Sequence, residues 1–344
     1  MKAGAKETRA YLYELKDLGG KLKAVVESIN QSAFKRLVGI STNTDILSVQ
    51  LTDLHKAAEA LGQESSMTIL QVATPQINTG ATLSAYIPSG VLTTAYRIMV
   101  AQGGASYELT LDLNYTDANR TIQQKLADLI NQDSRLNIIC TMNLSENKGI
   151  STLTLEGSAT GEQAKFTIQD IEGDLIAKLE ADQLTQEAAD AVYTLNNMVS
   201  SSDKNTIDLG NGLSVTLKQP TVDPVYISVL PDYQKTEEEI LKMIDLFNKL
   251  RKLAQQNPAG KDQGGVSALQ QRLDSTIRIF LDHTLTKIGI VAGQKGFLQA
   301  DLDSLKSAIK DGTAEEALSG KSMFMRSVYQ IAQSVFNDPQ QFVG

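Results

Sequence analysis

The sequence predicts an α+β protein in which both ends of the chain form one discontinuous helical domain around an inserted, antiparallel β-rich domain. Two patterns carry this prediction. Apolar residues recur every three or four positions near both ends, whereas the middle third alternates apolar and polar residues. The length of 344 residues suits about two domains. We expect the helical domain to span residues 1–71 and 231–344, and the β-rich domain to span residues 72–230.

The amino-terminal segment predicts an amphipathic helix of roughly seven turns. Its apolar face has six members: Leu12, Leu15, Leu18, Leu22, Val26 and Ile29. The pair Gly19-Gly20 lies within this helix, and each glycine costs about 1 kcal/mol relative to alanine in a helix interior. We therefore expect a kink at this pair.

Short runs with the period of a strand follow the first helix. They cover residues 37–40, 46–51 and 67–72, and residues 53–61 between them predict one or two helical turns. The clearest strand spans residues 107–115, where every second residue is apolar. Gln102-Gly103-Gly104 joins it to residues 96–100 in a predicted hairpin.

The rest of the middle third predicts one short helix and several more strands. The helix covers residues 122–130, and strands are expected at residues 136–140, 151–155, 166–168, 213–217 and 225–229. Gly210-Asn211-Gly212 predicts a tight hairpin turn before the fourth of these strands, because Asn-Gly favours the positive φ values of primed turns.

The carboxy-terminal third returns to the helical period. Thr236 and Glu239 have the spacing of a capping box at the start of a helix whose apolar face includes Ile240 and Phe247. Further helices are expected at residues 269–285, 302–309 and 323–336, with a Pro- and Gly-containing loop at residues 257–265.

The composition excludes several classes of function. The net charge is −8, and the chain has one cysteine, two histidines and no tryptophan. Nucleic-acid binding is disfavoured because phosphate neutralisation needs clustered Lys and Arg. A lone cysteine permits neither an internal disulfide nor a Cys-based zinc finger. No apolar run approaches the ~18–20 residues of a spanning helix, and the amino terminus has no apolar signal-peptide core.

Three partial motifs resemble catalytic or binding sequences and fail on inspection. Gly320-Lys321-Ser322 ends like a phosphate-binding loop, but Glu315 occupies the position of its first glycine. Asp301 and Asp303 open like a calcium loop, but Lys306 occupies its obligatory glycine position. Gly104-Ala105-Ser106 lacks the closing glycine of a nucleophile elbow, since Glu108 stands there.

Isolated reactive residues favour structural readings as well. His55 and His283 each follow an aspartate by one or two positions without a matching serine signal, so both are expected on the surface. The pair Glu315-Glu316 could in principle supply the two carboxylates of a glycosidase. Because the chain has no tryptophan to stack a sugar, we expect this pair to lie on a solvated face. Cys140 lies in an apolar run and is expected to pack as a small hydrophobe. We expect no catalytic residue, no metal ion and no cofactor. The sequence alone does not identify the residues of an interface.

Three segments, taken in order, carry a family resemblance. The first is Ser66–Ala73, read as a strand after the amino-terminal helix. The second runs from Ala191–Leu195 through Asn205-Thr206-Ile207 to Gly212–Lys218. The third is Ile288-Gly289-Ile290, followed by Gly296-Phe297-Leu298 and then Asp301. There, Gly289 suits the left-handed position after a helix and Asp301 suits a helix N-cap.

Together these segments resemble the bacterial flagellar filament cap family, also called hook-associated protein 2, over residues 11–318. The chain resembles the family's core without its terminal coiled-coil segments, and with one β-rich head domain where the family commonly has two. The resemblance implies a non-enzymatic protein that forms a ring at the filament tip and promotes flagellin polymerisation. It implies a helical leg domain and a β-rich head. The implied partners are other copies of the chain, flagellin and hook-associated proteins, without nucleic acid or membrane insertion.

The resemblance further implies an extracellular location at the flagellar tip, reached through the flagellar secretion system without a cleaved signal peptide. Adhesion to host glycans such as mucin is a second role that a tip protein can have. The alternatives are another axial component such as a hook–filament junction protein, a secreted surface adhesin, an unrecognised hydrolase, and an α+β scaffold without an assigned partner.

Overall fold

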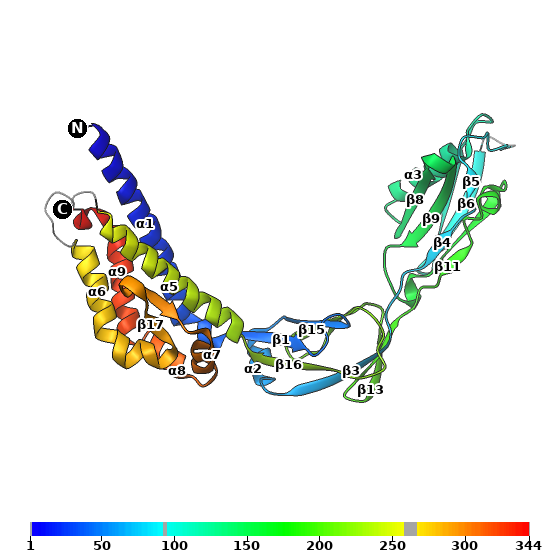
Figure 1. Cartoon of the computed structure of the whole chain (residues 1–344). Coiled ribbons are helices and arrows are strands. Elements are labelled where there is room, and N and C mark those ends of the chain that lie inside the picture. Colours follow the sequence, from blue (N-terminus) through cyan, green and yellow to red (C-terminus); the bar gives the residue numbers. More distant parts are fainter. Residues whose placement is uncertain (1, 92–94, 258–266, 344) are drawn as a thin grey trace. The chain divides into compact units, whose positions relative to one another are not determined.

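The computed structural model describes residues 2–91, 95–257 and 267–343. The chain divides into two compact units (Figure 1). Residues 1–38 and 230–344 form the helical unit, and residues 39–229 form the β unit. The predicted fold class is confirmed, because helices from both chain ends flank an inserted region of antiparallel sheets. Most of the loop expected at residues 257–265 lies outside the described residues.

The two units meet at residues 38/39 on the amino-terminal side, earlier in the chain than the expected boundary at 71/72. Strand β2 (Leu47–Leu51) pairs with β15 (Leu213–Leu217), and β3 (Glu64–Gln71) pairs with β12 (Ala191–Leu195) and β16 (Val225–Pro231). Residues 39–71 therefore belong to the β unit, because their strands find partners there.

The helical unit consists of helices and one short hairpin. Its helices are α1 (Lys2–Gln31), α5 (Tyr233–Gln255), α6 (Ala268–Phe280), α7 (Leu302–Lys310), α8 (Thr313–Leu318) and α9 (Met323–Asn337). Its short helical turns are η1 (Ala33–Lys35), η4 (Leu281–Leu285, a π-helical turn), η5 (Thr286–Ile288), η6 (Gln294–Gly296) and η7 (Pro339–Phe342). Strands β17 (Ile290–Ala292) and β18 (Leu298–Ala300) form the hairpin.

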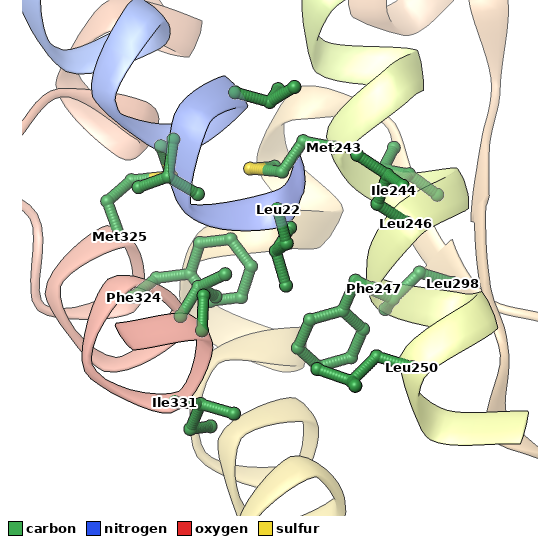
Figure 2. Close-up of a cluster of buried hydrophobic side chains, with 14 of the residues drawn as sticks. Leu22, Met243, Ile244, Leu246, Phe247, Leu250, Leu298, Phe324, Met325 and Ile331 are labelled. Atoms are coloured by element: carbon green, nitrogen blue, oxygen red, sulfur yellow. The ribbon is translucent and has the colours of Figure 1, made fainter. Parts of the chain in front are cut away.

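One apolar core holds the helical unit together. It joins residues of α1 to residues of α5, α6 and α9, although about 190 residues separate the two parts of the chain. Figure 2 shows Leu22 of α1 between Phe324 of α9 and Phe247 of α5. These three side chains are almost fully buried. Burial of such a side chain contributes about 1.5–3 kcal/mol, so this junction is a principal source of the unit's stability.

The expected first helix is α1, which runs through Gly19-Gly20 without a break in its helical assignment from Lys2 to Gln31. The glycines bring α1 close to α9. A Cβ added to Gly19 would lie 2.8 Å from the Cγ1 atom of Val335 and 2.9 Å from the backbone nitrogen of Phe336. A glycine is needed at this position because the backbones of the two helices approach too closely for a side chain.

The described part of the β unit contains several helices or helical turns and most of the strands. The strands not yet named are β1 (Leu37–Ser41), β4 (Ile77–Thr79), β5 (Leu83–Ser84), β6 (Ala95–Gln102), β7 (Ala105–Asp112), β8 (Ile138–Ser145), β9 (Ile150–Gly157), β10 (Phe166–Glu172), β11 (Leu184–Gln186), β13 (Met198–Ser202) and β14 (Thr206–Asp208). The helices and turns are α2 (Leu54–Glu59), η2 (Glu146–Lys148), α3 (Asn119–Gln132), η3 (Glu162–Ala164) and α4 (Leu175–Leu179).

These strands form two groups where the sequence suggested one head region. The sheets β1-β16-β3-β12-β13 and β14-β15-β2 combine strands from the beginning and the end of the β unit. The sheets β10-β6-β7 and β11-β4-β9-β5, with β8 paired to β9, use strands between residues 77 and 186. Helix α3 packs on the second group, where Ile122 and Leu126 share a core with Tyr96 of β6.

The hairpin turns agree only in part with the sequence. Gly103 and Gly104 have positive φ values and join β6 to β7, as expected. Between β14 and β15, Gly210 and Gly212 have positive φ but Asn211 does not, so the expected Asn-Gly primed turn is wrong in detail. Asn196-Asn197 supplies two consecutive positive φ values between β12 and β13.

We predict that Gly19→Ala destabilises the helical unit by about 1–3 kcal/mol, because the new methyl group overlaps the backbone of α9. The loss is expected although alanine by itself favours a helix by about 1 kcal/mol. Urea unfolding of the whole chain, followed by circular dichroism at 222 nm, measures the change.

Gly20→Ala is the matched control. Its added Cβ would lie 3.0 Å from the ring edge of Phe336, and that half-buried side chain can move. We expect this variant to be as stable as the original chain. Equal stability of both variants would contradict the close-approach interpretation.

Candidate interaction surface

The histidines do not form a reactive pair with their neighbouring aspartates. Asp53 is the N-cap of α2, and its Oδ1 accepts hydrogen bonds from the backbone N–H groups of His55 at 2.9 Å and Lys56 at 3.3 Å. These bonds, led by that of Lys56, lower the pKa of the Asp53 carboxyl. His55 and His283 are both exposed. The Asp53–His55 spacing therefore reflects a helix cap.

The three partial motifs also have local structural roles. Ser322 is the N-cap of α9 and accepts a bond from the backbone N–H of Met325 at 3.1 Å. Asp301 is the N-cap of α7, as expected, and the backbone N–H of Ser304 bonds to it at 2.8 Å. That bond lowers the pKa of Asp301. Gly104 lies in the β6–β7 turn, and Glu315 with Glu316 lies in the first turn of α8.

Two searches of the described part of the chain concern metals and membranes. Residues 2–91, 95–257 and 267–343 contain no group of three or more His, Cys, Asp or Glu side chains placed to hold a metal ion. Within the same ranges, no helix combines the length and the apolar character that crossing a membrane requires.

Cys140 is a packed core residue in β8. Its side chain is buried, and burial raises the pKa of the thiol to about 12. The side-chain amide of Asn131 in α3 holds the backbone here, donating to the Cys140 carbonyl at 2.7 Å and accepting from its N–H at 2.8 Å. The thiol is therefore protonated and enclosed at neutral pH.

A cluster of polar side chains lies where the chain leaves and re-enters the helical unit, and it links the segments that meet there. Arg36 pairs with Glu239 of α5 at 2.7 Å, and the hydroxyl of Ser28 donates to the same carboxylate at 3.1 Å. The backbone N–H of Asp232 donates to the Arg36 carbonyl at 2.9 Å. The cluster joins α1, the turn after it and the start of α5.

This cluster corrects the expected capping box at Thr236 and Glu239. The N-cap of α5 is Asp232, whose carboxylate accepts from the backbone N–H of Lys235 at 2.9 Å. The buried Thr236 hydroxyl instead donates to the Ala33 carbonyl at 2.7 Å. Both residues of the expected box are used for contacts between α5 and the end of α1, which local spacing does not reveal.

The solvent side of α1 carries two charged rows. Lys6, Arg9, Tyr13 and Lys16 form the first, which we call the basic stripe. Glu7, Ala10 and Glu14 form the second, which we call the acidic stripe. Residues three or four apart lie on one face of a helix, so each stripe forms a continuous row. All seven residues are exposed, and Tyr13 is 79% exposed.

A groove between α1 and α9 continues the basic stripe. Its volume is about 490 Å³, and its lining includes Tyr13, Lys16, Gly20, Lys23 and Phe336. The ammonium groups of Lys16 and Lys23 lie 5.6 and 5.9 Å from the centre of the Phe336 ring. The groove thus combines an aromatic wall with charged side chains of both signs, since Asp17 and Glu27 also line it.

A second groove, of about 730 Å³, lies between α6 and α9. Its lining is mostly uncharged and includes Gln271, Ser275, Ser327 and Gln330, with Arg272 as its one charged member. The guanidinium of Arg272 stacks over Phe342, 5.7 Å from the ring centre. This groove offers hydrogen-bonding groups without a directing charge.

Apolar periodicity does not point to these surface residues, because it marks only the apolar face of each helix. The signal was present: Lys6, Arg9, Tyr13 and Lys16 have the 3–4–3 spacing of one helical face. The Arg36–Glu239 pair had no such signal, since 203 positions separate the two residues.

The chain was compared with family models, curated sequences and solved structures. Residues 188–337 match the family model of the flagellar hook-associated protein 2 C-terminus. A search of curated protein sequences finds no match. The chain is similar in fold to the crystal structure of the flagellar cap protein FliD D1-D2-D3 domains from Escherichia coli. That similarity has a TM-score of 0.54 at 17% identity and covers 93% of this chain and 96% of that one.

Two further solved structures match smaller parts of the chain. The D2-D3 domains of the cap protein FliD from Serratia marcescens (space group I422) match at 19% identity with a TM-score of 0.44, covering 53% of this chain and 99% of that one. FliD (HAP2) from Pseudomonas aeruginosa PAO1 matches at 17% identity with a TM-score of 0.42, covering 60% and 94%.

We predict that Cys140 does not react with a thiol reagent such as DTNB in the native chain at pH 8. Its raised pKa keeps the thiol protonated at this pH, and burial blocks access. Unfolding in guanidinium chloride should release one equivalent of thiol per chain. Rapid labelling of the native chain would contradict the packing described for β8.

We predict that Arg36→Ala destabilises the helical unit by about 1–3 kcal/mol, because Glu239 is largely shielded from water and would lose its charged partner. Thermal unfolding of the whole chain measures this effect. Lys235→Ala is the control, since it removes an ion pair to Glu238 that is exposed on the same helix. Equal losses in the two variants would show that burial of the Arg36–Glu239 pair has no special weight.

Proposed function

We propose that this chain belongs to the flagellar hook-associated protein 2 family and caps the flagellar filament, because its residues 188–337 match the family model of the hook-associated protein 2 C-terminus. Copies of the chain assemble as a ring at the filament tip and promote the polymerisation of arriving flagellin subunits. The role is structural and needs no catalytic residue. The observation that carries the proposal is the family match over residues 188–337.

The described surface suits this role. A cap must contact neighbouring copies and flagellin, and the helical unit offers two charged stripes and two open grooves for such contacts. Its core is built from both chain ends and leaves these faces exposed. The helical unit is therefore the proposed leg, and the β unit is the proposed head.

The proposed capping role also implies where the chain acts and which proteins it contacts. The chain would be exported by the flagellar secretion system without a cleaved signal peptide, and it would act outside the cell next to hook-associated proteins and flagellin. Adhesion to host mucin is an additional role that the family resemblance suggests, and it has no supporting observation among the described residues.

Deletion of the gene in the bacterium that encodes this chain tests the function. We expect short or absent filaments in electron micrographs and monomeric flagellin in the culture medium, because subunits leave the channel without being folded into place. Expression of the intact gene from a plasmid should restore filament length.

Normal filaments in the deletion strain would overturn the capping role. Normal motility combined with a loss of binding to mucin-coated surfaces would support the adhesin alternative in its place. Loss of the hook–filament connection, seen as detached but full-length filaments, would support a junction protein.

A further inference from the structure

We propose that α1 is the contact surface between copies of this chain, with the basic stripe of one copy lying against the acidic stripe of the next. This inference rests on the proposed self-assembly and names the surface that performs it. The occupant of each stripe is a second copy, since the chain itself carries both halves of the contact on one helix.

Within the described part of the chain, the charges of the two stripes have no ion-pair partners, and the Lys16 ammonium lies over the Phe336 ring. Among the described residues, Lys6, Arg9 and Lys16 have no carboxylate within 4.0 Å, and Glu7 and Glu14 have no cation within that distance. The next charged residues along the helix differ, because Lys21 pairs with Asp17 at 2.6 Å and Lys23 pairs with Glu27 at 3.3 Å. Among the described charged side chains of α1 from Lys6 onward, those without an ion pair therefore lie within residues 6–16.

Residues 6–10 pack less tightly within the helical unit than the rest of α1. None of their side chains is buried, and from Lys6 onward Tyr11 is the first buried residue. In Figure 1 the first turns of α1 extend beyond the ends of α5 and α9. A helical segment with few buried side chains is marginal in water, so a covering partner would stabilise these turns.

The geometry of one helix makes the contact directional. Consecutive residues are about 100° apart around a helix, so the two stripes face different directions. A copy that receives a neighbour on its basic stripe still presents its acidic stripe to another neighbour. Such a head-to-tail contact repeats, and it gives a ring where the rotation between copies closes.

Parallel packing of two α1 helices in the same register matches opposite charges along the whole stripe. Glu7 of one copy lies level with Lys6 and Arg9 of the next, and Glu14 lies level with Tyr13 and Lys16. Ala10 stands between the two glutamates and leaves room for the exposed Tyr13 ring of the neighbour. Side chains flanking a helix interface pair in this way and set both partner and orientation.

Two charge-reversed variants test the contact. The first carries Arg9→Glu and Lys16→Glu, which makes both stripes acidic. The second carries Glu7→Lys and Glu14→Lys, which makes both stripes basic. Sedimentation velocity of the whole chain in 50 mM NaCl, over a range of concentrations, measures association.

We expect the original chain to associate, and we expect each variant alone to need at least about ten-fold more protein to reach the same mean mass, because two attractions become repulsions. Mixing the two variants should restore association, since the acidic stripes of one then meet the basic stripes of the other. Raising the salt to 500 mM should weaken association of the original chain, because the charges are exposed.

Lys148→Glu with Lys204→Glu is the matched control. It lowers the net charge by the same amount as Arg9→Glu with Lys16→Glu, at exposed sites of the β unit, and should associate like the original chain. Association of either charge-reversed variant at the original concentration, or no recovery on mixing, would overturn the proposal. An original chain that stays monomeric at all concentrations would also overturn the proposal. The partner of the stripes would then be a different protein. Failure of the capping role is a separate outcome, read from filaments in the deletion strain.

Discussion

The helical unit depends on one constraint: α1 must pack against α5 and α9, although the β unit separates them in the sequence. Closing a flexible loop of this length costs conformational entropy before any core contact forms. The fold reduces that cost, because β1 and β16 are neighbours in one sheet and carry the chain out of and back into the helical unit. The pairing of β1 with β16 therefore brings the end of α1 close to the start of α5. The Arg36–Glu239 ion pair then links these two segments directly.

The elements that sequence patterns predicted well are those set by local periodicity. The alternation from Tyr107 onward and the apolar face of the first helix both correspond to observed elements, β7 and α1. The errors occur where a distant partner overrides a local preference. From the sequence alone, Gly19-Gly20 predicts a kink, because the close approach of α9 is not visible there. Thr236 likewise predicts a helix cap, because the Ala33 carbonyl that accepts its hydrogen bond is distant in the sequence. The assignment of residues 39–71 failed for the same reason, since their strand partners come from residues 191–231.

Apolar periodicity alone cannot show which exposed surface of a protein makes contacts. A buried face is visible in a single sequence because burial requires apolar residues. An exposed face is not, because many polar residues are compatible with water. The stripes on α1 are an example. Their spacing is visible in the sequence, but only the structure shows that Lys6, Arg9 and Lys16 have no carboxylate partner in the described chain, whereas Lys21 and Lys23 do.

The distribution of charge between the units favours contact through helices over contact through sheets. The β unit holds 22 acidic and 10 basic residues, a net charge of −12, which leaves the helical unit with 18 acidic and 22 basic residues and a net charge of +4. Two β units therefore repel each other at low ionic strength, while two helical units repel far less. Net repulsion keeps the isolated chain soluble, and a helical contact with opposite charges in register provides a local attraction against it.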